Sequence, residues 1–551
     1  MNALDALAKV NVLMEAKQYQ QALTVLESVL GAEPANLDAL ECLRQLLDLT
    51  GHYAAAVQWL IRFLENNPQA HHGYSLLGYV MCKLGQFEAG IECFDQALVL
   101  APQDVRSTCE RATALSELGQ HAQALAGYNQ ALALDPVYAD AHAYRGSSLL
   151  ALGQPDAAIA SFDRAITLNP RMASAFVNRG NAYMQKDTYP LALANYDQAI
   201  DLQPGNVLAH ANRAVALKHL HLHEESLASS KTAIRLDPSY LDAQFNLALS
   251  HLLCGDLEQG FRSYQVRWKT AKFAATKRQF QQALWLGDAP IAGKRLLVHN
   301  EQGLGDSIQF CRFVTSAAQA GAQVIYEVEA PLYGLMQSLG GVHTLARQRE
   351  PLPAFDYYCP VMSLPVALGT RMDNIPAPTP YLRAPADKLL QWKERLGTAP
   401  GPRIGLVWSG SPSHKGDRHR SIALGTLLQA LPLGPQYISL QKELRQNDAA
   451  ALAQVPGLQY FGDEIVDFSD TAALCTLMDL VIAVDTSIAH LAGALGTPTW
   501  LLLPHLPDWR WLLDRSDTPW YPQMRLFRQE NVGDWEPVFD RVHAQIASKA
   551  W

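Results

Sequence analysis

Apolar and polar positions in the first half of the chain repeat with a fixed period. Prolines recur every 34 residues, at Pro34, Pro68, Pro102, Pro136, Pro170, Pro204 and Pro238. Small residues recur in the same phase at Ala124, Ala158 and Ala192. A small residue lets two helices approach closely, and the recurring glycines end one helix and turn the chain into the next. The pattern predicts a solenoid of helix pairs over residues 1–274.

A different pattern begins after a connecting segment, residues 275–293. Short apolar runs of strand length now alternate with stretches of helical period. Strands are predicted at 296–299, 323–328, 356–359, 403–408, 437–440, 458–461, 480–484 and 499–503. Helices are predicted at 307–320, 331–339, 471–479, 488–495 and 536–548. The proline-rich run 375–380 separates the two series, so we expect two Rossmann-like α/β lobes, residues 294–385 and 386–551, with a cleft at their strand ends.

Composition narrows the function classes. A chain of 551 residues is too long for one core, and a net charge of −9 argues against a nucleic-acid binder. No stretch is long and apolar enough to span a bilayer, and the segment from Met1 to Ala6 lacks the basic and apolar regions of a secretory signal. We therefore expect a cytoplasmic protein. The eight cysteines show no paired metal spacing, which favours buried thiols.

The first candidate site follows the strand at 296–299. Gly303, Gly305 and Asp306 form a turn between this strand and the next helix. Glycines allow the backbone to bend tightly and to approach a ligand, and ligands of parallel sheets gather at such turns. Taken alone, Asp306 is better explained as the cap of the following helix.

Two further stretches lie at strand ends of the second lobe. The loop Trp408–Arg420 carries the cations Lys415, Arg418 and Arg420, which suit phosphate oxygens. The stretch Asp485–His490 passes from a strand into a helix start, where Thr486 and Ser487 offer hydroxyls beside free amides. The structural alternatives are ordinary capping for the hydroxyls and a packed helix residue for His490.

The first half resembles the tetratricopeptide repeat, whose period and helix–turn–helix unit match. The resemblance implies a groove for extended peptides. Asn178, Asn212 and Asn246 recur at a groove-facing position, similar to the asparagine ladder of the O-linked N-acetylglucosamine transferases, and side-chain amides can hold a peptide backbone. Arginines recur one position after the asparagine position of the repeats, and Arg111 and Arg145 are among them. These arginines are interpreted as stacking or surface packing.

Three features of the repeats have structural interpretations. Arg44 and Arg267 stand where small residues are usual and are interpreted as solenoid caps. His219, His221 and His223 alternate in the manner of metal ligands on a strand, but the repeat phase puts them at a turn. A solvated turn is therefore expected there.

The second half resembles the heptosyltransferase-like glycosyltransferases of the two-lobed GT-B fold. The resemblance implies Asp306 as general base, Lys415 as a phosphate contact, and Asp485, Thr486, Ser487 and His490 beside a sugar diphosphate. The segment from Pro504–Trp511 through Trp520–Pro522 departs from simple heptosyltransferases, so the resemblance does not identify the donor sugar. Its aromatic residues are explained either by stacking on a ligand or by core packing, as are Trp500 and Trp511.

Together these patterns predict an inverting, metal-independent glycosyltransferase. The nucleotide sugar is a substrate, no cofactor or metal is required, and the repeats recruit a protein or peptide acceptor. The alternative is a non-catalytic peptide-binding scaffold that carries a degenerate glycosyltransferase domain. Retention of Asp306, Lys415 and Asp485 favours the enzyme, and the absence of a Gly-x-Ser-x-Gly elbow argues against a hydrolase.

Overall fold

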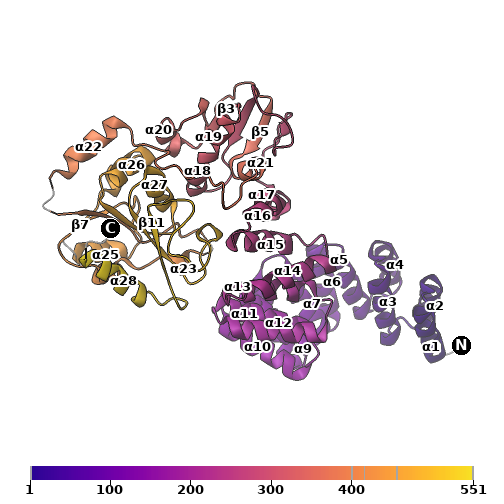
Figure 1. The fold of residues 1–551 in the computed structure, drawn as a ribbon. Helices are drawn as coiled ribbons and strands as arrows, with labels where there is room; N and C mark the ends of the chain where they lie inside the picture. Colours follow the sequence, from indigo (N-terminus) through magenta and orange to yellow (C-terminus); the bar gives the residue numbers. More distant parts are fainter. Residues whose placement is uncertain (1–2, 399–400, 415, 455–456, 549–551) are drawn as a thin grey trace. The chain divides into compact units, whose positions relative to one another are not determined.

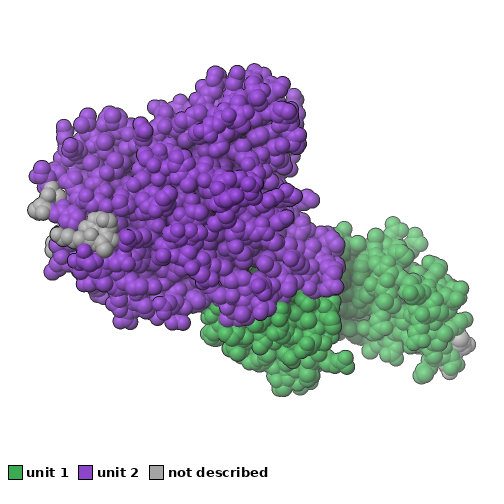
Figure 2. All heavy atoms as spheres, in the orientation of Figure 1, with its two compact units in different colours: residues 1–216 green, residues 217–551 purple. Residues whose placement is uncertain are grey.

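The computed structural model describes residues 3–398, 401–414, 416–454 and 457–548. The chain divides into two compact units, Met1–Ala216 and Leu217–Trp551. Figure 2 colours the two units separately. Each unit is described by itself below.

Unit 1 consists of antiparallel helix pairs (Figure 1). Its helices are α1 (Ala3–Glu15), α2 (Tyr19–Ala32), α3 (Leu37–Thr50), α4 (Tyr53–Asn66), α5 (His71–Lys83), α6 (Phe87–Leu100), α7 (Val105–Glu117), α8 (His121–Leu134), α9 (Ala139–Ala151), α10 (Pro155–Leu168), α11 (Ala173–Gln185) and α12 (Tyr189–Leu202). The division between the units falls within α13 (Val207–His219). The helix pairs predicted from the period are confirmed.

Small residues set the spacing of the helices within a pair. A Cβ atom added at Gly146 would lie 2.6 Å from the ring of Phe162, and one added at Gly180 would lie 2.6 Å from the ring of Tyr196. Both rings are buried on the partner helix. The glycines therefore admit an aromatic side chain that any larger residue would displace.

The second helix pair departs from this packing. Where Gly78, Gly146 and Gly180 stand in later repeats, α3 carries Arg44, and α4 carries Phe63 where later repeats carry alanine. In the described residues of unit 1, α3 does not pack along α4 as α5 packs along α6. A cavity of about 570 Å³ lies beside them and is lined by residues of α2, α3 and α4.

Unit 2 contains two parallel sheets (Figure 1). The strand order of the first is β1-β5-β2-β3-β4, with β1 (Ala283–Leu284), β2 (Arg295–His299), β3 (Gln323–Val328), β4 (Val342–Arg347) and β5 (Tyr357–Pro360). That of the second is β11-β10-β9-β6-β7-β8, with β6 (Arg403–Val407), β7 (Gln436–Ser439), β8 (Leu458–Gln459), β9 (Leu480–Val484), β10 (Thr499–Leu503) and β11 (Met524–Arg528). An α/β organisation with two parallel sheets is therefore confirmed.

Three strands escaped the sequence analysis, and all three lie at or near sheet edges. β1 falls inside the predicted connecting segment and pairs with β5 through only two residues. β4 and β11 are edge strands whose side chains are partly exposed, so neither shows the continuous apolar run of a central strand such as β9.

The remaining helices of unit 2 flank the sheets or precede them. They are α14 (His223–Leu236), α15 (Leu241–Leu253), α16 (Leu257–Ser263), α17 (Ala271–Ala274), α18 (Leu304–Phe310), α19 (Arg312–Gln319), α20 (Tyr333–Met336), α21 (Leu364–Ala367), α22 (Ala386–Leu396), α23 (Asp417–Arg420), α24 (Leu424–Ala430), α25 (Asp448–Gln454), α26 (Phe468–Thr476), α27 (Ser487–Leu495) and α28 (Glu536–Ala547). Short 3₁₀ helices are η1 (Tyr264–Lys269), η2 (Ala330–Leu332), η3 (Val361–Ser363), η4 (Gly462–Glu464) and η5 (Trp509–Trp511). The helix predicted at 307–320 is divided into α18 and α19.

The helix pairs α14 to α16 belong to the same compact unit as the sheets, whereas the repeat period continues to residue 274. Arg267, in η1, gives one reason. Its side chain is fully buried and bonds Glu301 through Nε and Nη2, both at 2.9 Å. Nη2 also donates to Ser363 at 2.8 Å. The interpretation of Arg267 as a solenoid cap is wrong, because its charge is paired inside the protein.

The interpretation of Arg44 as a cap also fails, for a related reason. Its guanidinium pairs with Glu110 at 2.5 Å, across 66 positions of the chain, and lies 3.7 Å from the centre of the Tyr79 ring. Arg44 therefore joins the second repeat to later ones.

The alternating histidines lie at a turn, as expected, but this turn is only partly solvated: Leu222 is exposed, whereas His221 and His223 are half-buried. The ring centre of His221 lies 4.4 Å from that of His505, in the loop after β10. Burial, with Lys218 as the next cause, lowers the pKa of His219 to about 3. Contact with the α/β part, which the repeat phase cannot indicate, covers one side of this turn.

The structure also bears on the expectations for the cysteines, for membrane-spanning helices and for two tryptophans. Cys109, Cys311, Cys359 and Cys475 are buried, whereas Cys254 is exposed. None of the helices in the described ranges has both the length and the apolar character that a bilayer span requires. Trp500 and Trp511 are buried, so core packing is the correct interpretation of both.

Candidate functional site

The turn between β2 and α18 holds Asp306 in a fixed orientation. Asp306 lies in the first turn of α18, and its Oδ2 accepts the backbone N–H of Gly303 at 2.9 Å. Asp306 is therefore not the N-cap of a helix starting near Ser307: α18 begins at Leu304 with Gly303 as its N-cap, and Asp306 bonds back to that residue from the first turn. The other oxygen, Oδ1, accepts a hydrogen bond from Nη2 of Arg510.

Gly305 lies where the first-sheet turn meets the second sheet's helix α27. A Cβ atom added at Gly305 would lie 3.2 Å from Cα of Ser487 and 3.2 Å from Cδ2 of His490. Close approach of two backbones is what glycine permits at such a position. The structure thus brings together Gly305, Asp306, Ser487 and His490, which the sequence placed in different lobes.

Arg510 joins the two sides of this contact. It follows β10 in η5, and it is almost fully buried. Its Nη1 donates to Asp508 at 2.7 Å and its Nε donates to Oε1 of Gln309 at 2.7 Å, in addition to the bond with Asp306. The neighbouring carboxylates keep the pKa of Arg510 above its ordinary value, although burial alone would lower it. The guanidinium is therefore a fixed positive charge between the two sheets.

The start of α27 carries a polar group without a partner. Thr486 occupies the N-cap position, yet its side chain makes no capping bond, and Oγ1 is a buried atom with no hydrogen-bond partner in the structure. The capping interpretation of Thr486 is therefore wrong. A buried hydroxyl beside free helix amides is suited to an anionic oxygen.

Asp485 precedes this helix start and lies among other charges. Burial and then the neighbouring Asp508 raise the pKa of Asp485 to about 6. The backbone oxygen of Asp485 accepts a hydrogen bond of 2.7 Å from Nη1 of Arg420, which fixes the loop containing Arg420 to the end of β9. The positive charges of Arg420 and Arg510 act in the opposite direction and lower the pKa of Asp485.

His490 is a packed residue, as its structural interpretation predicts. Its ring stacks on that of Trp511 with centres 5.1 Å apart, and Nδ1 lies 3.0 Å from the hydroxyl oxygen of Tyr521. Burial, and then the charge of Arg510, hold the pKa of His490 well below its ordinary value. His490 is therefore neutral and presents Cδ2 to Gly305.

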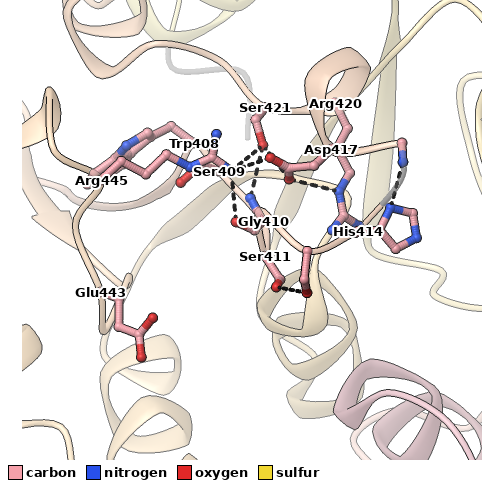
Figure 3. A network of polar contacts seen from close by, with 12 residues as sticks. Trp408, Ser409, Gly410, Ser411, His414, Asp417, Arg420, Ser421, Glu443 and Arg445 are labelled. Atoms are coloured by element: carbon pink, nitrogen blue, oxygen red, sulfur yellow. Dashed lines mark hydrogen bonds and ion pairs between the residues drawn. The ribbon is translucent and has the colours of Figure 1, made fainter. Parts of the chain in front are cut away.

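The loop after β6 is held by an ion-pair network around the buried Asp417 (Figure 3). Asp417 accepts from Arg445 and, at 2.8 Å, from the hydroxyl of Ser421, and it pairs with Arg420 at 3.5 Å. Burial alone would raise the pKa of Asp417, but the bonds from Ser421 and Arg445 outweigh it and lower the pKa. Arg445 also donates to the backbone oxygen of Gly410 at 2.9 Å. These bonds fix the backbone at both ends of the segment 410–417.

The three predicted cations of this loop have different positions. Arg420 is directed towards Asp485, as described above. Arg418 is exposed, and its Nε lies 3.1 Å from Nε2 of His419. Lys415 lies outside the described residues.

The asparagine row of the repeats is partly exposed. Asn178 donates to the hydroxyl of Ser147 at 3.3 Å, and Asn212 donates to Oδ1 of Asn181 at 2.9 Å. Asn246 is half-buried on α15. Each donor bond spans 31 positions, so these amides contact the preceding repeat.

The arginines beside that row form ion pairs, in agreement with a packing role. Arg111 pairs with Asp95 and Arg213 with Asp197, both at 2.6 Å, and Arg179 pairs with Asp163. Each aspartate lies 16 positions earlier. At the same offset from Arg145 stands Asn129, and the buried Nε of Arg145 has no hydrogen-bond partner in the structure.

One group of side chains in the described residues has the arrangement of metal ligands. His71, His72 and Asp104 offer ligand atoms that all lie within 4.8 Å of one another. Asp104 also caps α7 by accepting from the backbone N–H of Arg106 at 3.1 Å. This group lies in the repeats, among helix starts of unit 1, and not at the sheet ends.

Sequence reasoning missed the residues that connect the site. Arg510, Asp508 and Gln309 were not singled out, although Arg510 and Asp508 lie in the strand-end loop whose departure from heptosyltransferases was noted. Arg267 was noted only as a departure from the repeat. A charged residue in an apolar strand-end loop is the signal that was available for Arg510.

Comparisons with known proteins match the repeats. Models of the tetratricopeptide repeat match residues 13–78 and, in overlapping segments, residues 109–173, 145–207 and 177–239. Among curated proteins, the chain is 28% identical over 326 residues to Protein FlbA of Caulobacter vibrioides. That alignment covers 54% of this chain and 54% of FlbA, so the chain spans about half the length of this relative.

Solved structures also match mainly as repeat proteins. The chain is similar to a chain of the APC/C hetero-tetramer Cut9-Hcn1, with 16% identity, coverage of 49% of this chain and 55% of that one, and a TM-score of 0.42. It is similar to TTC0263, a tetratricopeptide-repeat protein of Thermus thermophilus, with 25% identity, coverage of 33% and 100%, and a TM-score of 0.31. With the family models, the helix pairs and their period, the first half of the chain consists of tetratricopeptide repeats.

Proposed function

We propose that the protein is an inverting, metal-independent glycosyltransferase. In this proposal, a nucleotide-sugar donor binds at the start of α27, and the repeats present a protein or peptide acceptor. The observation that carries the proposal is the meeting of the Gly303–Asp306 turn with Ser487 and His490 at the strand ends of two parallel sheets. Ligands of such sheets bind outside the strand carboxyl ends.

The chemistry requires a base and a site for a leaving diphosphate. The acceptor hydroxyl oxygen would form a bond to the anomeric carbon of the donor, while the bond from that carbon to the diphosphate oxygen breaks and its electron pair leaves with the nucleoside diphosphate. The acceptor's proton would pass to Asp306. The amides and the unpartnered Thr486 hydroxyl at the start of α27 would bind the diphosphate.

Fixed cations would balance the charge that develops on the diphosphate. Arg420 and Arg510 both act on Asp485 at the helix start. Lys415 is the further cation that the glycosyltransferase resemblance implies. Three positive side chains suit a diphosphate without a metal ion.

Recruitment of a protein is the part of the proposal with the broadest support. Tetratricopeptide repeats suggest peptide or protein partners, and the row of Asn178, Asn212 and Asn246 offers partly exposed amides. The scaffold alternative is favoured by one observation: both carboxylate oxygens of Asp306 have protein partners. A base must release one of them to receive a proton.

Calorimetry with nucleoside diphosphates tests the proposal. The full chain should bind at least one of UDP, GDP, CDP and ADP in buffer containing EDTA, and the affinity should fall with salt because the contacts are ionic. Lys415→Ala should weaken the same binding, whereas Lys442→Ala, in the loop after β7, serves as a matched control. Absence of binding by all four nucleotides, or binding that EDTA abolishes, would contradict the proposal.

A further inference from the structure

One hydrogen-bond partner of Arg510 is Asp306, and Asp306 must be free of that bond to act as the base in catalysis. Its three hydrogen-bonded partners are Gln309, Asp508 and Asp306. Gln309 is neutral, and Asp508 lies two positions away in the same loop, so both orient the guanidinium. Only Asp306 comes from the turn that would supply the base. Arg510 is thus bonded to α18 through both Gln309 and Asp306, and only the bond to Asp306 involves the candidate base.

The same guanidinium lies close enough to the start of α27 to influence the groups there. Trp511, the next residue in the chain, stacks on His490 of α27 with ring centres 5.1 Å apart, and Gly305, next to Asp306, approaches Ser487. Oγ1 of Thr486 at the start of α27 and Nε2 of Gln309, whose Oε1 accepts from Arg510, are buried and have no hydrogen-bond partner among the described residues. A hydroxyl, an amide N–H and a guanidinium around one helix start are donors for the oxygens of a diphosphate.

We propose that Arg510 is a ligand of the donor diphosphate and that it exchanges Asp306 for the phosphate oxygens when the donor binds. This inference rests on the function proposed above. Gln309 and Asp508 hold the guanidinium in place, while Nη2 moves from one anion to the other. Donor binding then frees an oxygen of Asp306 to accept the acceptor's proton.

The carboxylate of Asp306 and the donor diphosphate compete for the guanidinium of Arg510. This competition explains why donor binding comes before the release of Asp306. While Nη2 of Arg510 donates to Oδ1 of Asp306, that oxygen is occupied by a protein hydrogen bond. Once the diphosphate takes over the Nη2 donor, Oδ1 of Asp306 is available to an acceptor hydroxyl. The site would therefore acquire its base only after the donor is bound.

The exchange predicts that replacing Asp306 and replacing Arg510 change the affinity for the diphosphate in opposite directions. Asp306→Asn removes the competitor of the diphosphate and should tighten its binding about five- to tenfold, because a charge-assisted hydrogen bond no longer has to be broken. Arg510→Gln should weaken the binding by about tenfold or more. Arg510→Lys, which keeps the charge but not the fork of donors, should give an intermediate loss.

A double-mutant cycle separates exchange from ordinary repulsion. Removing any carboxylate near an anion site can tighten binding, and that general effect persists when Arg510 is replaced. The exchange requires the positive charge at position 510, so Asp306→Asn should change the affinity less than about twofold in the Arg510→Gln background, whereas the Arg510→Lys background, which keeps the charge, should retain part of the tightening. The probes are inorganic pyrophosphate and the nucleoside diphosphate that binds the parent protein, measured by calorimetry in EDTA.

Each outcome has a distinct meaning. Tightening by Asp306→Asn in the parent that disappears in the Arg510→Gln background supports the exchange. Absence of tightening in the parent, or tightening of the same size in the Arg510→Gln background, overturns it while the proposed donor site remains. Absence of diphosphate binding by the parent protein overturns the proposed function itself. Unfolding curves of each variant establish that the folded protein is compared throughout.

Discussion

The middle repeats and the last helix pair fill the same position of the 34-residue unit in opposite ways. Five repeats place a fully buried alanine there: Ala97, Ala131, Ala165, Ala199 and Ala233. The last places Arg267, which is also fully buried but is bonded to Glu301, in the turn after β2. An alanine lets two helices pack, whereas the arginine fixes a repeat to the strand end that carries the candidate site. A residue that departs from the repeat pattern, such as Arg267, therefore indicates a contact with a part of the chain outside its own repeat.

The second repeat supports the same conclusion from the other end of the chain. Arg44 and Phe63 replace small residues, and α3 and α4 of the described chain lie apart beside a cavity. Arg44 is used instead for an ion pair with Glu110. The consequence of losing a small residue thus depends on what the larger side chain contacts.

The largest expected effect is at Arg267. Arg267→Ala should lower the free energy of unfolding of the α/β part by about 3–5 kcal/mol, because Glu301 would be left buried without its charge partner. Urea unfolding followed by tryptophan fluorescence reports on this part, since ten of the eleven tryptophans follow residue 216. Arg213→Ala, which breaks a partly exposed ion pair with Asp197, is the matched control and should change stability by about 0–1 kcal/mol. Equal effects of the two variants would remove the contrast between the regions.

A smaller effect is expected where the middle repeats follow the pattern. Gly180→Ala should destabilise unit 1 by about 1–3 kcal/mol, because the added Cβ atom would meet the buried ring of Tyr196 at 2.6 Å. Gly205→Ala is the control, since nothing lies within 4 Å of a Cβ atom there. Circular dichroism during thermal unfolding measures both. A tolerated Gly180→Ala would mean that the helix spacing is not set by the small residue.

The pH dependence of stability tests the electrostatics of the helix start. The folded pKa of Asp485, about 6, lies above its ordinary value of 3.8. Its contribution to stability is therefore fully present below about pH 4 and is lost as the pH rises through 6. Asp485→Asn should come close to the parent near pH 4 and exceed it by about 2–3 kcal/mol at about pH 8. Urea midpoints at the two pH values give the comparison, and a variant less stable than the parent at the higher pH would contradict it.

The smallest individual effects are expected along the asparagine row. Each amide should contribute about 0.5–1.5 kcal/mol to acceptor binding, so the triple variant Asn178→Ala, Asn212→Ala, Asn246→Ala is the informative one. It should raise the apparent KM for a protein acceptor by about tenfold or more and leave the Kd of the donor unchanged. Steady-state kinetics and calorimetry measure the two quantities. An unchanged KM would mean that the protein acceptor does not bind along the asparagine row.

The sequence predicted the repeats well because their contacts are local. A period of 34 residues records the packing of Gly180 on Tyr196, only 16 positions apart. The central strands were equally predictable, since β9 is apolar along its whole length. Edge strands such as β4 were missed because partial exposure weakens the pattern.

The candidate site was predictable only in its separate parts. The turn at Gly305 and the helix start at Ser487 could be found from strand–turn–helix patterns. Their contact, and the bond between Arg510 and Asp306 across 204 positions, depend on how the two sheets face each other. A periodic pattern carries no information on that arrangement. The ring contact between His221 and His505 was missed for the same reason.

Turnover of Asp306→Asn tests the central claim most directly. The full chain is incubated with the nucleotide sugar that it binds and a protein acceptor, and release of the nucleoside diphosphate is followed. The account predicts that the parent turns over and that Asp306→Asn lowers kcat by about 10²–10⁴-fold while still binding the donor, because the amide preserves the shape of the turn but cannot take the acceptor's proton. An Asp306→Asn protein that binds the donor and turns over at the parental rate would contradict the claim.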